Sequence, residues 1–383
     1  MPLALIAGAG IGGLAAGIAL RRAGWDIRVF ERADTPRAIG FALGLAPNAV
    51  AALRELGLAD SIVARGITPT AVEVRRVDGR VLRRFAGRLA ERPKGDVPSV
   101  ILRPVLHSGL LDALGPDAVE VNHAAVGFHL DGTRVRLDLA NGASATGDIL
   151  IGADGVGSVI RAQLHPREAP ARPSGYFAVR GESPAIAKLG GLQALWYFGR
   201  GVESGVIQAS PRAIYWFVSL WSEDVTSGPV DVASVMRRCT SGFDEQFHDI
   251  TGATPPDQMR LDELFARDPL DRWGAGPVTL LGDAAHPMLP HTGQGAAQAL
   301  EDAVALGRVM KSGADHLAAL RRYEQVRGRH TRRVVSMGPR IAAMTTTKNP
   351  VVQFLRDTAI RIVPEMALVK VFTQTGRDPH RGL

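Results

Sequence analysis

The first 31 residues constrain the fold more than any other stretch of the chain. A β-type apolar run begins at Leu3, a glycine-rich turn with GxGxxG spacing covers Gly8 to Gly13, and a helical pattern continues to Arg22. A second strand-like run, Asp26 to Phe30, ends at Glu31. This order of strand, glycine-rich turn, helix and strand is typical of the start of a Rossmann-like parallel sheet.

The glycines and the acid in this stretch predict a dinucleotide site. Gly8 permits the tight turn, Gly10 lets the backbone approach a pyrophosphate, and Gly13, next to Gly12, lets helix and strand pack closely. Glu31 lies about twenty residues further on, where an acid accepts hydrogen bonds from an adenosine ribose. An acid there repels a 2′-phosphate, so FAD or NAD is favoured over NADP at this site.

A membrane helix is the main alternative for the same residues. Leu3 to Leu20 is 18 residues without a charge and contains GxxxG spacings, which a hydropathy window reads as a membrane span with a dimerisation face. No basic region precedes it, and its five glycines weaken a continuous helix. We therefore expect no membrane span here.

Composition limits the remaining classes of protein. The 383 residues, 46% of them hydrophobic, allow two domains with substantial cores. The single cysteine, Cys239, fits a reducing compartment and a cytoplasmic location. The net charge of +7 comes from arginines spread along the chain. For their densest cluster, Arg321 to Arg340, a solvated helical face is at least as good an explanation as a phosphate-binding patch, and we expect no nucleic-acid partner.

A second turn between a strand and a helix, placed to meet a ligand, is predicted near residue 154. We call such turns corners, and the glycine-rich turn Gly8 to Gly13 is the first. The apolar run after Asp148 ends at Asp154-Gly155, and a helical pattern follows. A carboxylate at this position either meets a bound ligand or caps the helix in an Asx turn. Earlier, Arg103 precedes the helical pattern His107 to Leu114, where it either meets an anion or lies on the surface.

A third corner follows the strand-like run Val278 to Leu281. It comprises Gly282-Asp283, an irregular passage with Pro290 and Gly293-Gln294-Gly295, and an alanine-rich helix that starts near Ala296. The unpaired N–H groups and the dipole of a helix start favour a negative group. Asp283 is placed to accept hydrogen bonds from sugar-alcohol hydroxyls. An ordinary glycine-rich turn is the alternative.

The middle of the chain predicts a separate sheet. Gly175 to Gly181, Gln193 to Phe198, Val206 to Ser210 and Ala213 to Trp221 are aromatic and β-branched runs between turns. Strand alternation places Tyr215 and Phe217 on one face and Trp216 on the other. We favour Tyr215 as a substrate contact, with a plain core role as the alternative. The glycine-rich stretch Gly40 to Asn48 is predicted to be a loop.

Other chemistries find no support in the sequence. The histidines show no HExxH spacing and one cysteine builds no cysteine-rich zinc site, so no metal is expected. No GxSxG turn indicates a serine nucleophile. The apolar stretch Val351 to Phe372 is helical in period and broken at Pro364; it packs on the first domain, forms a dimer contact or touches a membrane surface.

Together the three corners resemble those of the class A FAD-dependent aromatic hydroxylases, which have the p-hydroxybenzoate hydroxylase fold. The similarity extends over about residues 1–330 and is greatest to the salicylate hydroxylase, urate hydroxylase and zeaxanthin epoxidase subset. It implies an α/β fold: a Rossmann-like FAD-binding domain of the GR2 type, a β-sheet substrate domain and C-terminal helices. We assign 1–66, 101–168 and 262–335 to the FAD-binding domain, 67–100 and 169–261 to the substrate domain, and 336–383 to the C-terminal helical segment.

The resemblance also implies roles for single residues. Glu31 holds the ribose, Arg32 and Arg103 contact FAD, Asp154 supports the pyrophosphate, and Asp283 binds the ribityl chain. The residues of the third corner implied to face the flavin are Pro290, Gly293, Gln294, Gly295 and Ala296, with Pro290 also a candidate substrate contact. Phe41-Ala42 departs from the Ala-Gly of many relatives.

The implied reaction is hydroxylation or epoxidation of an aromatic or heteroaromatic substrate by O2. NADH or NADPH, bound transiently without a second Rossmann domain, reduces tightly bound FAD, and a flavin C4a-hydroperoxide attacks the substrate. No protein side chain is assigned as catalytic, since the flavin carries the chemistry. A monomer or homodimer is expected. The alternatives are a flavin-dependent reductase or dehydrogenase and a halogenase, although the halogenase WxWxIP signature is absent.

Overall fold

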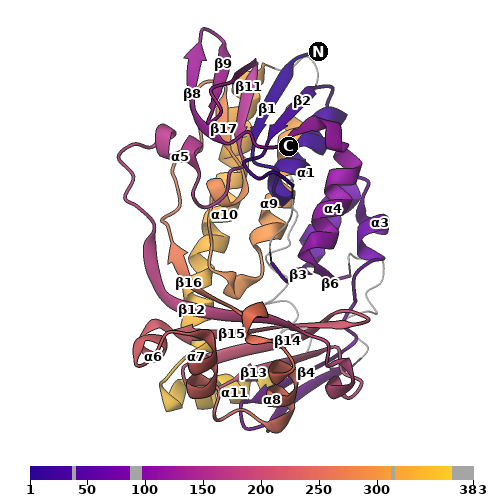
Figure 1. The fold of residues 1–383 in the computed structure, drawn as a ribbon, viewed down its shortest axis with the longest axis vertical. Coiled ribbons are helices and arrows are strands. Elements are labelled where there is room, and N and C mark those ends of the chain that lie inside the picture. Colours follow the sequence, from indigo (N-terminus) through magenta and orange to yellow (C-terminus); the bar gives the residue numbers. More distant parts are fainter. Residues whose placement is uncertain (37–39, 87–96, 312–314, 365–383) are drawn as a thin grey trace.

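The computed structural model describes residues 1–36, 40–86, 97–311 and 315–364. It has a parallel-sheet region at one end and a large, mostly antiparallel sheet at the other (Figure 1). Helices cover both regions, and the long helix α10 (His316–Thr345) reaches from the first region to the second. The expected α/β class with a separate sheet is confirmed. The predicted domain boundaries stay a prediction.

The five-stranded sheet has the order β17-β11-β1-β2-β7, and every paired neighbour runs parallel. Its central strand, β1, is a run of small and branched apolar residues that is buried on both faces, as strands of a doubly covered parallel sheet are. The strands are β1 (Leu3–Ala7), β2 (Asp26–Phe30), β7 (Val119–Glu120), β11 (Ile149–Gly152) and β17 (Val278–Leu280).

Helices pack around this sheet and share its core. Helix α1 packs against α9 and α4, and the uncharged stretch Leu3 to Leu20 is, as predicted, a strand followed by a core helix. The helices of this region are α1 (Ile11–Arg22), α2 (Pro47–Glu55), α3 (Ala59–Val63), α4 (Arg103–Leu114), α5 (Val159–Leu164) and α9 (Gly295–Val309). A three-stranded antiparallel sheet joins them: β8 (Ala125–Asp131), β9 (Arg134–Leu139) and β10 (Ser144–Gly147).

The large sheet has seven strands in the order β16-β12-β15-β14-β13-β4-β5. The four runs predicted from residues 175–221 form its centre, and strands from before and after them complete it. They are β4 (Ala71–Arg76), β5 (Val81–Ala86), β12 (Arg172–Ser183), β13 (Ala194–Phe198), β14 (Val202–Ser210), β15 (Ala213–Trp221) and β16 (Arg260–Ala266). Its outer face packs on α6 (Ser222–Thr226), α7 (Val232–Cys239) and α8 (Glu245–Gly252) (Figure 1).

Two sequence expectations are wrong. The passage Gly40 to Asn48 is not only a loop, because β3 (Ala42–Leu45) pairs antiparallel with β6 (Ser99–Leu102). The arginine cluster on α10 is not only a solvated face, since Arg327 is 0% exposed. The strand was not predicted because glycines in this passage indicate a turn. Arg327 is buried because it pairs with two buried acids, Glu301 and Asp302.

The end of the described chain is α11 (Pro350–Ile362), which lies beside β5 at the far end of the large sheet (Figure 1). The predicted break of the helical stretch near Pro364 agrees with its end at Ile362, and residues 365–372 of that stretch lie outside the described residues. Within the described ranges, no helix is long and apolar enough to cross a membrane.

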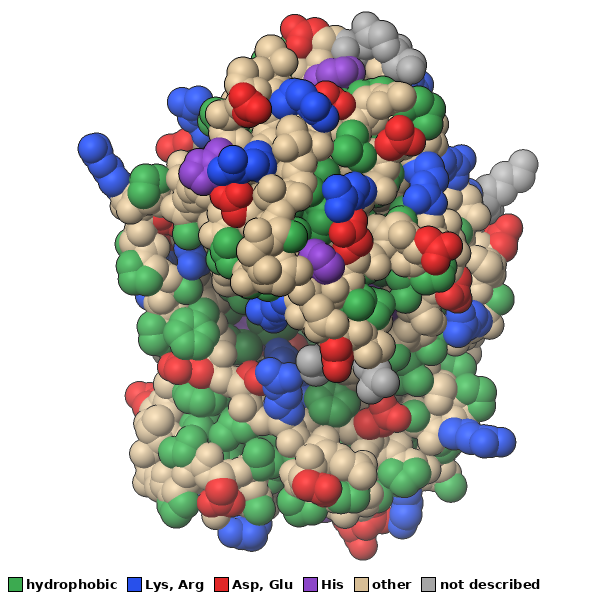
Figure 2. All heavy atoms as spheres, turned by 45° about the horizontal axis from the view of Figure 1, so that its top comes forward, with side chains coloured by type: hydrophobic (Ala, Val, Ile, Leu, Met, Phe, Trp, Pro, Cys, Tyr) green, Lys and Arg blue, Asp and Glu red, His purple; other side chains and the backbone are tan. Residues whose placement is uncertain are grey.

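The surface is a mixture of charges with a recess between the two regions. Acidic and basic side chains are interspersed on the face seen in Figure 2, and no single basic patch dominates it. The same view shows the surface hollowed where the upper and lower parts meet, with basic side chains at the recess.

Candidate active site

The carboxyl ends of four neighbouring strands bring the predicted corners together. Ala7 of β1 lies opposite Phe30 of β2 and Gly152 of β11, and Gly152 lies opposite Leu280 of β17. Glu31, Gly8, Asp154 and Asp283 follow these strands, so they line one edge of the sheet in that order. Ligands bind in open α/β sheets at this edge.

Three of the four glycines in the glycine-rich turn have no room for a side chain. Gly8 has φ +101°, and a Cβ added there would lie 2.5 Å from the Ala153 carbonyl oxygen. A Cβ on Gly13 would lie 1.9 Å from the Gly8 carbonyl oxygen, and one on Gly12 would lie 2.7 Å from Leu281 Cδ2. A Cβ on Gly10, by contrast, would meet no atom within 4 Å. The open space above Gly10 fits the approach of a pyrophosphate.

Glu31 holds the turn from the next strand. Its carboxylate accepts hydrogen bonds from the Ala9 amide at 2.9 Å and the Ala33 amide at 3.0 Å. Arg32 beside it is exposed. On the other side, the buried His107 ring contacts the Ala9 carbonyl oxygen through Nε2 at 2.7 Å. The turn is therefore fixed by both an acid and a histidine from distant segments.

The two carboxylate oxygens of Asp154 have different surroundings: one caps a helix and the other has no hydrogen-bond partner in the described part of the chain. Its Oδ2 accepts from the Val159 amide at 2.8 Å and the Ile160 amide at 3.3 Å, as an Asx cap does. Its Oδ1 is buried and has no hydrogen-bond partner within the described part of the chain. The cap interpretation is confirmed, and the ligand contact stays a prediction: an unpaired buried acceptor beside Gly8 fits a hydroxyl or an ordered water on a bound dinucleotide.

The third corner places Asp283 in front of the next helix. It lies in the 3-10 turn η4 (Gly282–Ala284), is exposed, and has its Oδ1 4.0 Å from where a Cβ on Gly295 would be. Exclusion of solvent lowers the pKa of the Arg103 guanidinium, an effect opposed by Asp283 and reinforced by Arg180 and Arg260. Arg103 therefore lies within electrostatic range of Asp283 and of two cations of the large sheet, Arg180 and Arg260.

The loop before α9 presents backbone N–H groups to the same cleft. The turn η5 (Pro290–Thr292) ends at Gly293, and α9 begins at Gly295, so the amides of Gly295 and Ala296 belong to its first turn. The Gln294 side chain is buried and its Oε1 accepts from Asn48 Nδ2 at 3.0 Å. This bond ties the loop to helix α2.

A buried ionic network supports both ends of this loop. Asp302 accepts hydrogen bonds from the Gly282 amide at 3.0 Å, His286 Nε2 at 2.6 Å and Arg327 Nε at 2.6 Å. Burial alone would raise the pKa of the Asp302 carboxyl, but His286 and Arg327 outweigh it and hold the pKa at about 2. Arg327 also donates to Glu301 at 2.7 Å, so one guanidinium neutralises two buried acids.

A second buried arginine joins the second corner to the third. Arg161 is 1% exposed and donates through Nη1 to the carbonyl oxygens of Ala284 and Ala285 at 3.0 and 3.1 Å. Glu168 binds its other edge at 2.6 and 2.8 Å. Asp154 and Asp283 are therefore held on one rigid frame.

The large sheet closes the cleft with a mixed aromatic and charged face. Tyr215 and Phe217 share that face, and Trp216 is buried on the other, as the alternation predicts. The Phe41 ring stacks on Tyr215 with centroids 6.0 Å apart. Burial raises the pKa of the Tyr215 phenol, and the nearby charge of Arg180 opposes this shift. Arg180 is bonded to Asp262 at 3.0 Å.

His291 connects the sheet to the loop before α9. Its Nε2 lies 2.7 Å from Ser219 Oγ on the same face of β15, and its ring meets Tyr176 edge-on at 5.2 Å. Burial and the charge of Arg180 lower the pKa of His291 to about 4, so the ring is neutral near pH 7. Its Nδ1 is buried without a partner among the described residues.

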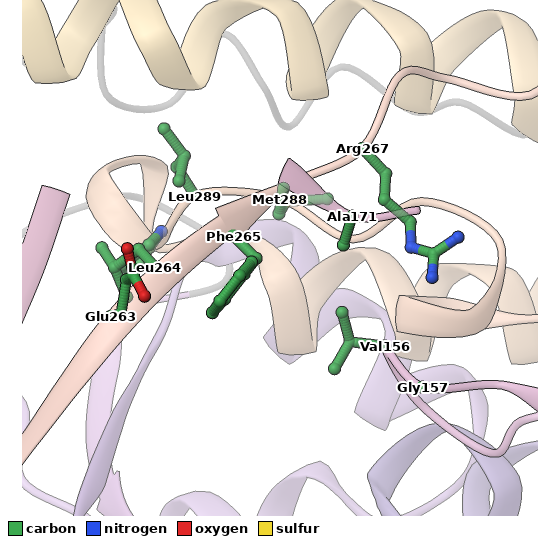
Figure 3. A pocket seen from close by; sticks show the side chains of 10 residues that line it. Val156, Gly157, Ala171, Glu263, Leu264, Phe265, Arg267, Met288 and Leu289 are labelled. Carbon is green, nitrogen blue, oxygen red and sulfur yellow. The ribbon is translucent and has the colours of Figure 1, made fainter. Parts of the chain in front are cut away.

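A hollow of about 360 Å³ has Pro290 in its wall, and Figure 3 labels the other side chains that line it. The Asp154 corner, strand β16 and the loop before α9 each form part of its wall. Its lining is mainly apolar, with Arg267 at one side: Val156, Gly157, Ala171, Glu263, Leu264, Phe265, Arg267, Met288, Leu289 and Pro290. Arg267 Nη1 donates to Glu168 at 3.2 Å, and no described atom pairs with its Nε.

The structure thus gathers the predicted corner residues along one edge of the parallel sheet, and their contacts to the cofactor stay predictions. Four supporting residues escaped the sequence analysis: His107, Arg161, Asp302 and Arg327. His107 shares helix α4 with Arg103, and Asp302 shares helix α9 with Ala296, but Arg161 and Arg327 lie on helices without a predicted site residue. Contacts that join these four residues to other segments span 16 to 123 positions. No group of three metal-ligating side chains occurs in the ranges described above.

Comparison with known proteins identifies the family of the chain and its cofactor. Residues 3–337 match the model of the FAD binding domain family. The chain is 32% identical to the aurachin C monooxygenase/isomerase of Stigmatella aurantiaca, with 94% of both chains covered. It is 35% identical to the 3-amino-4-hydroxybenzoate 2-monooxygenase of Streptomyces cremeus, with 88% and 86% covered.

A solved structure matches the whole chain. Klebsiella pneumoniae HpxO complexed with FAD and uric acid superposes with a TM-score of 0.91 at 28% identity, covering 100% of this chain and 98% of that one. These findings confirm the resemblance, the cofactor and the enzyme class, and they do not favour the reductase or halogenase alternative. The chain belongs to the FAD binding domain family, as one of its FAD-dependent class A monooxygenases.

Proposed function

We propose that this enzyme hydroxylates an electron-rich aromatic or heteroaromatic ring held between strand β15 and the loop before α9. The observation that carries the proposal is the 2.7 Å contact between Ser219 Oγ and His291 Nε2. Because Tyr215, Phe217 and Ser219 alternate on one face of β15, this contact turns the aromatic face toward the loop that contains Pro290. The proposed place for the flat ring is between these two surfaces, beside the Ser219–His291 contact.

Each corner has a proposed role toward FAD. Glu31 binds the adenosine ribose with Arg32 near the adenine, and the backbone at Gly8 to Gly13 and the free Oδ1 of Asp154 support the pyrophosphate. Asp283 binds the ribityl hydroxyls, with Arg103 across the cleft. The amides of the loop from Pro290 to Ala296 lie along the pyrimidine edge of the ring.

Bound FAD supplies hydride acceptance from NADH or NADPH and the activation of O2. The chain supplies placement and exclusion of water. The first N–H groups of α9 stabilise negative charge at the pyrimidine edge through the positive end of the helix. The large sheet covers the site, which protects the reactive oxygen from water.

Substrate recognition is proposed to rest on three polar groups. Arg180 is the cation of the face and attracts an ionised hydroxyl or carboxylate on the ring. Tyr215 keeps its proton at neutral pH and donates a hydrogen bond. His291 is neutral and has Nδ1 free for one more hydrogen bond. Phe41 and Phe217 supply apolar contact.

The hollow beside Pro290 is proposed to admit the nicotinamide of the transient co-substrate. It opens between the pyrophosphate corner and the loop that meets the flavin, and its apolar wall suits an aromatic ring (Figure 3). Arg267 Nε at its side has a free donor for a phosphate or an amide. We expect Arg267→Gln to raise KM for NADH or NADPH and to leave FAD content unchanged.

The names of the relatives bear on the substrate. They act on aurachin C and 3-amino-4-hydroxybenzoate, and one was solved with uric acid. Consistent with this range, we propose a ring that carries an acidic hydroxyl or a ring nitrogen. The single cysteine supports a cytoplasmic location, and we expect a monomer or homodimer.

A substrate screen tests this function. Purified enzyme with FAD is given phenolic, N-heteroaromatic and polyketide-like compounds, and NADH or NADPH oxidation is followed with 18O2. A true substrate accelerates oxidation and gains one 18O atom. Arg180→Gln should raise KM for an acidic substrate by about tenfold, while the exposed Arg212→Gln serves as the matched control. Stimulated oxidation with no 18O in any product would overturn hydroxylation.

A further inference from the structure

Helix α11 buries polar side chains and exposes apolar ones. Its inward side carries Gln353, Arg356 and Asp357, which are 8%, 7% and 4% exposed. Its outward side carries Val351, Phe354, Leu355 and Ile362, which are 63%, 67%, 59% and 73% exposed. A helix on a water-facing surface normally has the opposite arrangement, with the apolar stripe toward the core.

The inward polar residues fix the helix in this orientation. Arg356 donates to the Thr345 carbonyl oxygen at 2.9 Å and to Asp357 at 2.9 and 3.0 Å, and its guanidinium lies 4.8 Å from the Phe198 ring centroid. Asp357 also accepts from Arg76 at 3.0 Å. Since these buried groups pair only in this orientation, the helix cannot rotate to hide its apolar side without breaking them.

The two ends of α11 are held as well. Asn349 caps its first turn by accepting from the Val351 and Val352 amides at 2.9 and 3.3 Å. Arg83 on β5 donates to the Ile360 carbonyl oxygen at 3.0 Å near the other end. The apolar side is therefore presented by a fixed element.

A basic hollow of about 280 Å³ lies directly beside this apolar stripe. Phe354 and Thr358 form its edge, and three arginines line it: Arg76, Arg80 and Arg361. Its only acid, Asp357, is already paired with Arg76 and Arg356. The hollow thus has spare positive charge and bidentate donors that match a phosphate group.

We propose that α11 docks this enzyme on an anionic lipid surface. The side chains of Val351, Phe354, Leu355 and Ile362 enter the interface between headgroups and acyl chains, and Arg76, Arg80 and Arg361 bind lipid phosphate. Apolar side chains next to basic ones on one helix are the pattern of interfacial membrane helices. This contact is superficial, because no helix in the described ranges is long and apolar enough to cross a bilayer.

Charge argues against a second copy of the chain as the occupant. A twofold dimer places the same patch against itself. The arginines of each hollow would then approach those of the other copy beside the apolar stripe, and like charges at an interface are unfavourable. Lipid phosphates neutralise them.

Vesicle sedimentation with purified holoenzyme tests the proposal. We expect binding to vesicles of phosphatidylcholine with 30% phosphatidylglycerol and about tenfold weaker binding to phosphatidylcholine alone. The double variant Phe354→Ser, Leu355→Ser should bind about tenfold more weakly to both. The double variant Arg80→Glu, Arg361→Glu should lose the preference for anionic vesicles.

Matched controls keep these outcomes interpretable. Val126→Ser with Val230→Ser changes two other exposed apolar side chains, which are 55% and 50% exposed. Arg167→Glu with Arg212→Glu makes the same change of charge at two other exposed arginines. Both should bind like the parent, and every variant should keep its FAD absorbance. Absence of binding by the parent, unchanged binding by the α11 variants, or a dimer in light scattering that Phe354→Ser, Leu355→Ser dissociates would each overturn the proposal.

Discussion

The two sheets of this molecule build their halves of the site by different means. At the edge of the five-stranded sheet, the backbone and a few small or acidic residues form the site, and a Cβ on Gly13 would collide with the Gly8 carbonyl at 1.9 Å. At the seven-stranded sheet, side chains form it: Tyr215 and Arg180 from its strands, and His291 from the loop before α9. The first half is thus specified by local spacing and the second by which side chains meet across distant strands.

Two glycine substitutions should separate folding from cofactor binding most strongly. Gly13→Ala should prevent stable folding and FAD retention, because its Cβ would lie 1.9 Å from a backbone oxygen. Gly10→Ala should leave the apoprotein melting temperature unchanged and weaken FAD at least about tenfold, since its Cβ enters the open space proposed for the pyrophosphate. Gly44→Ala, also in open space but away from the turn, is the control. Equal FAD affinity for Gly10→Ala and Gly44→Ala would contradict this assignment.

The next largest effect should come from the buried network behind the loop. Arg327→Met removes the partner of two buried acids and should destabilise the folded protein by about 3–5 kcal/mol. Urea unfolding measures this, and Arg332→Met on the exposed side of α10 is the control. A loss below about 1 kcal/mol would show that the network does not support the loop.

Asp283→Ala should act on the cofactor and not on the fold. Asp283 is exposed, and we expect mostly apoprotein, with FAD affinity reduced about 10- to 100-fold by the loss of charge-assisted hydrogen bonds. Fluorescence titration of FAD gives the affinity, and Asp268→Ala is a control on another exposed acid. Full yellow FAD content in purified Asp283→Ala would refute the ribityl role.

A fall in pH should lower the free energy of unfolding through protonation of His291. Its pKa is about 4 when folded and about 6.5 when unfolded, so the unfolded chain binds the proton first as the pH falls. Stability is unaffected above about pH 6.5 and falls between 6.5 and 4, by about 2 kcal/mol at pH 5. Urea unfolding at pH 7.5 and pH 5 should show a smaller difference in His291→Asn. An identical difference in parent and variant would contradict a neutral buried ring.

Tyr215→Phe should give the smallest effect and the most selective one. FAD binding and the melting temperature should not change, because the ring still stacks with Phe41. Substrate KM and the fraction of uncoupled NAD(P)H oxidation should rise by severalfold if the phenol contacts the substrate. Unchanged affinity and coupling would remove Tyr215 from the site.

The sequence predicted the part of the site at the five-stranded sheet better than the part at the seven-stranded sheet. The corners at Gly8, Asp154 and Asp283 were predictable because each motif is local and parallel strands align their carboxyl ends. The strand Ala42–Leu45 was missed because Gly40 before it and Gly44 within it indicate a turn, and its partner strand lies more than fifty residues away. Arg327 was misread as a surface residue, since only the folded chain brings Glu301 and Asp302 to it.

For the part of the site at the seven-stranded sheet, the sequence predicted only which residues of β15 share a face. The pattern at Ile214 to Val218 gave the faces of β15 correctly, yet it could not indicate that Arg180 and His291 lie beside Tyr215. Phe41, noted only as a departure from relatives, proved to be the stacking partner of Tyr215. Substrate specificity therefore depends on contacts between segments far apart in the chain.

The flavin content of the purified protein after incubation with excess FAD tests the central claim most directly. The strand ends at Glu31, Gly8, Asp154 and Asp283 should hold one FAD per chain, with flavin absorbance that survives gel filtration and altered flavin fluorescence. A colourless folded protein that leaves the fluorescence of added FAD unchanged would contradict the account.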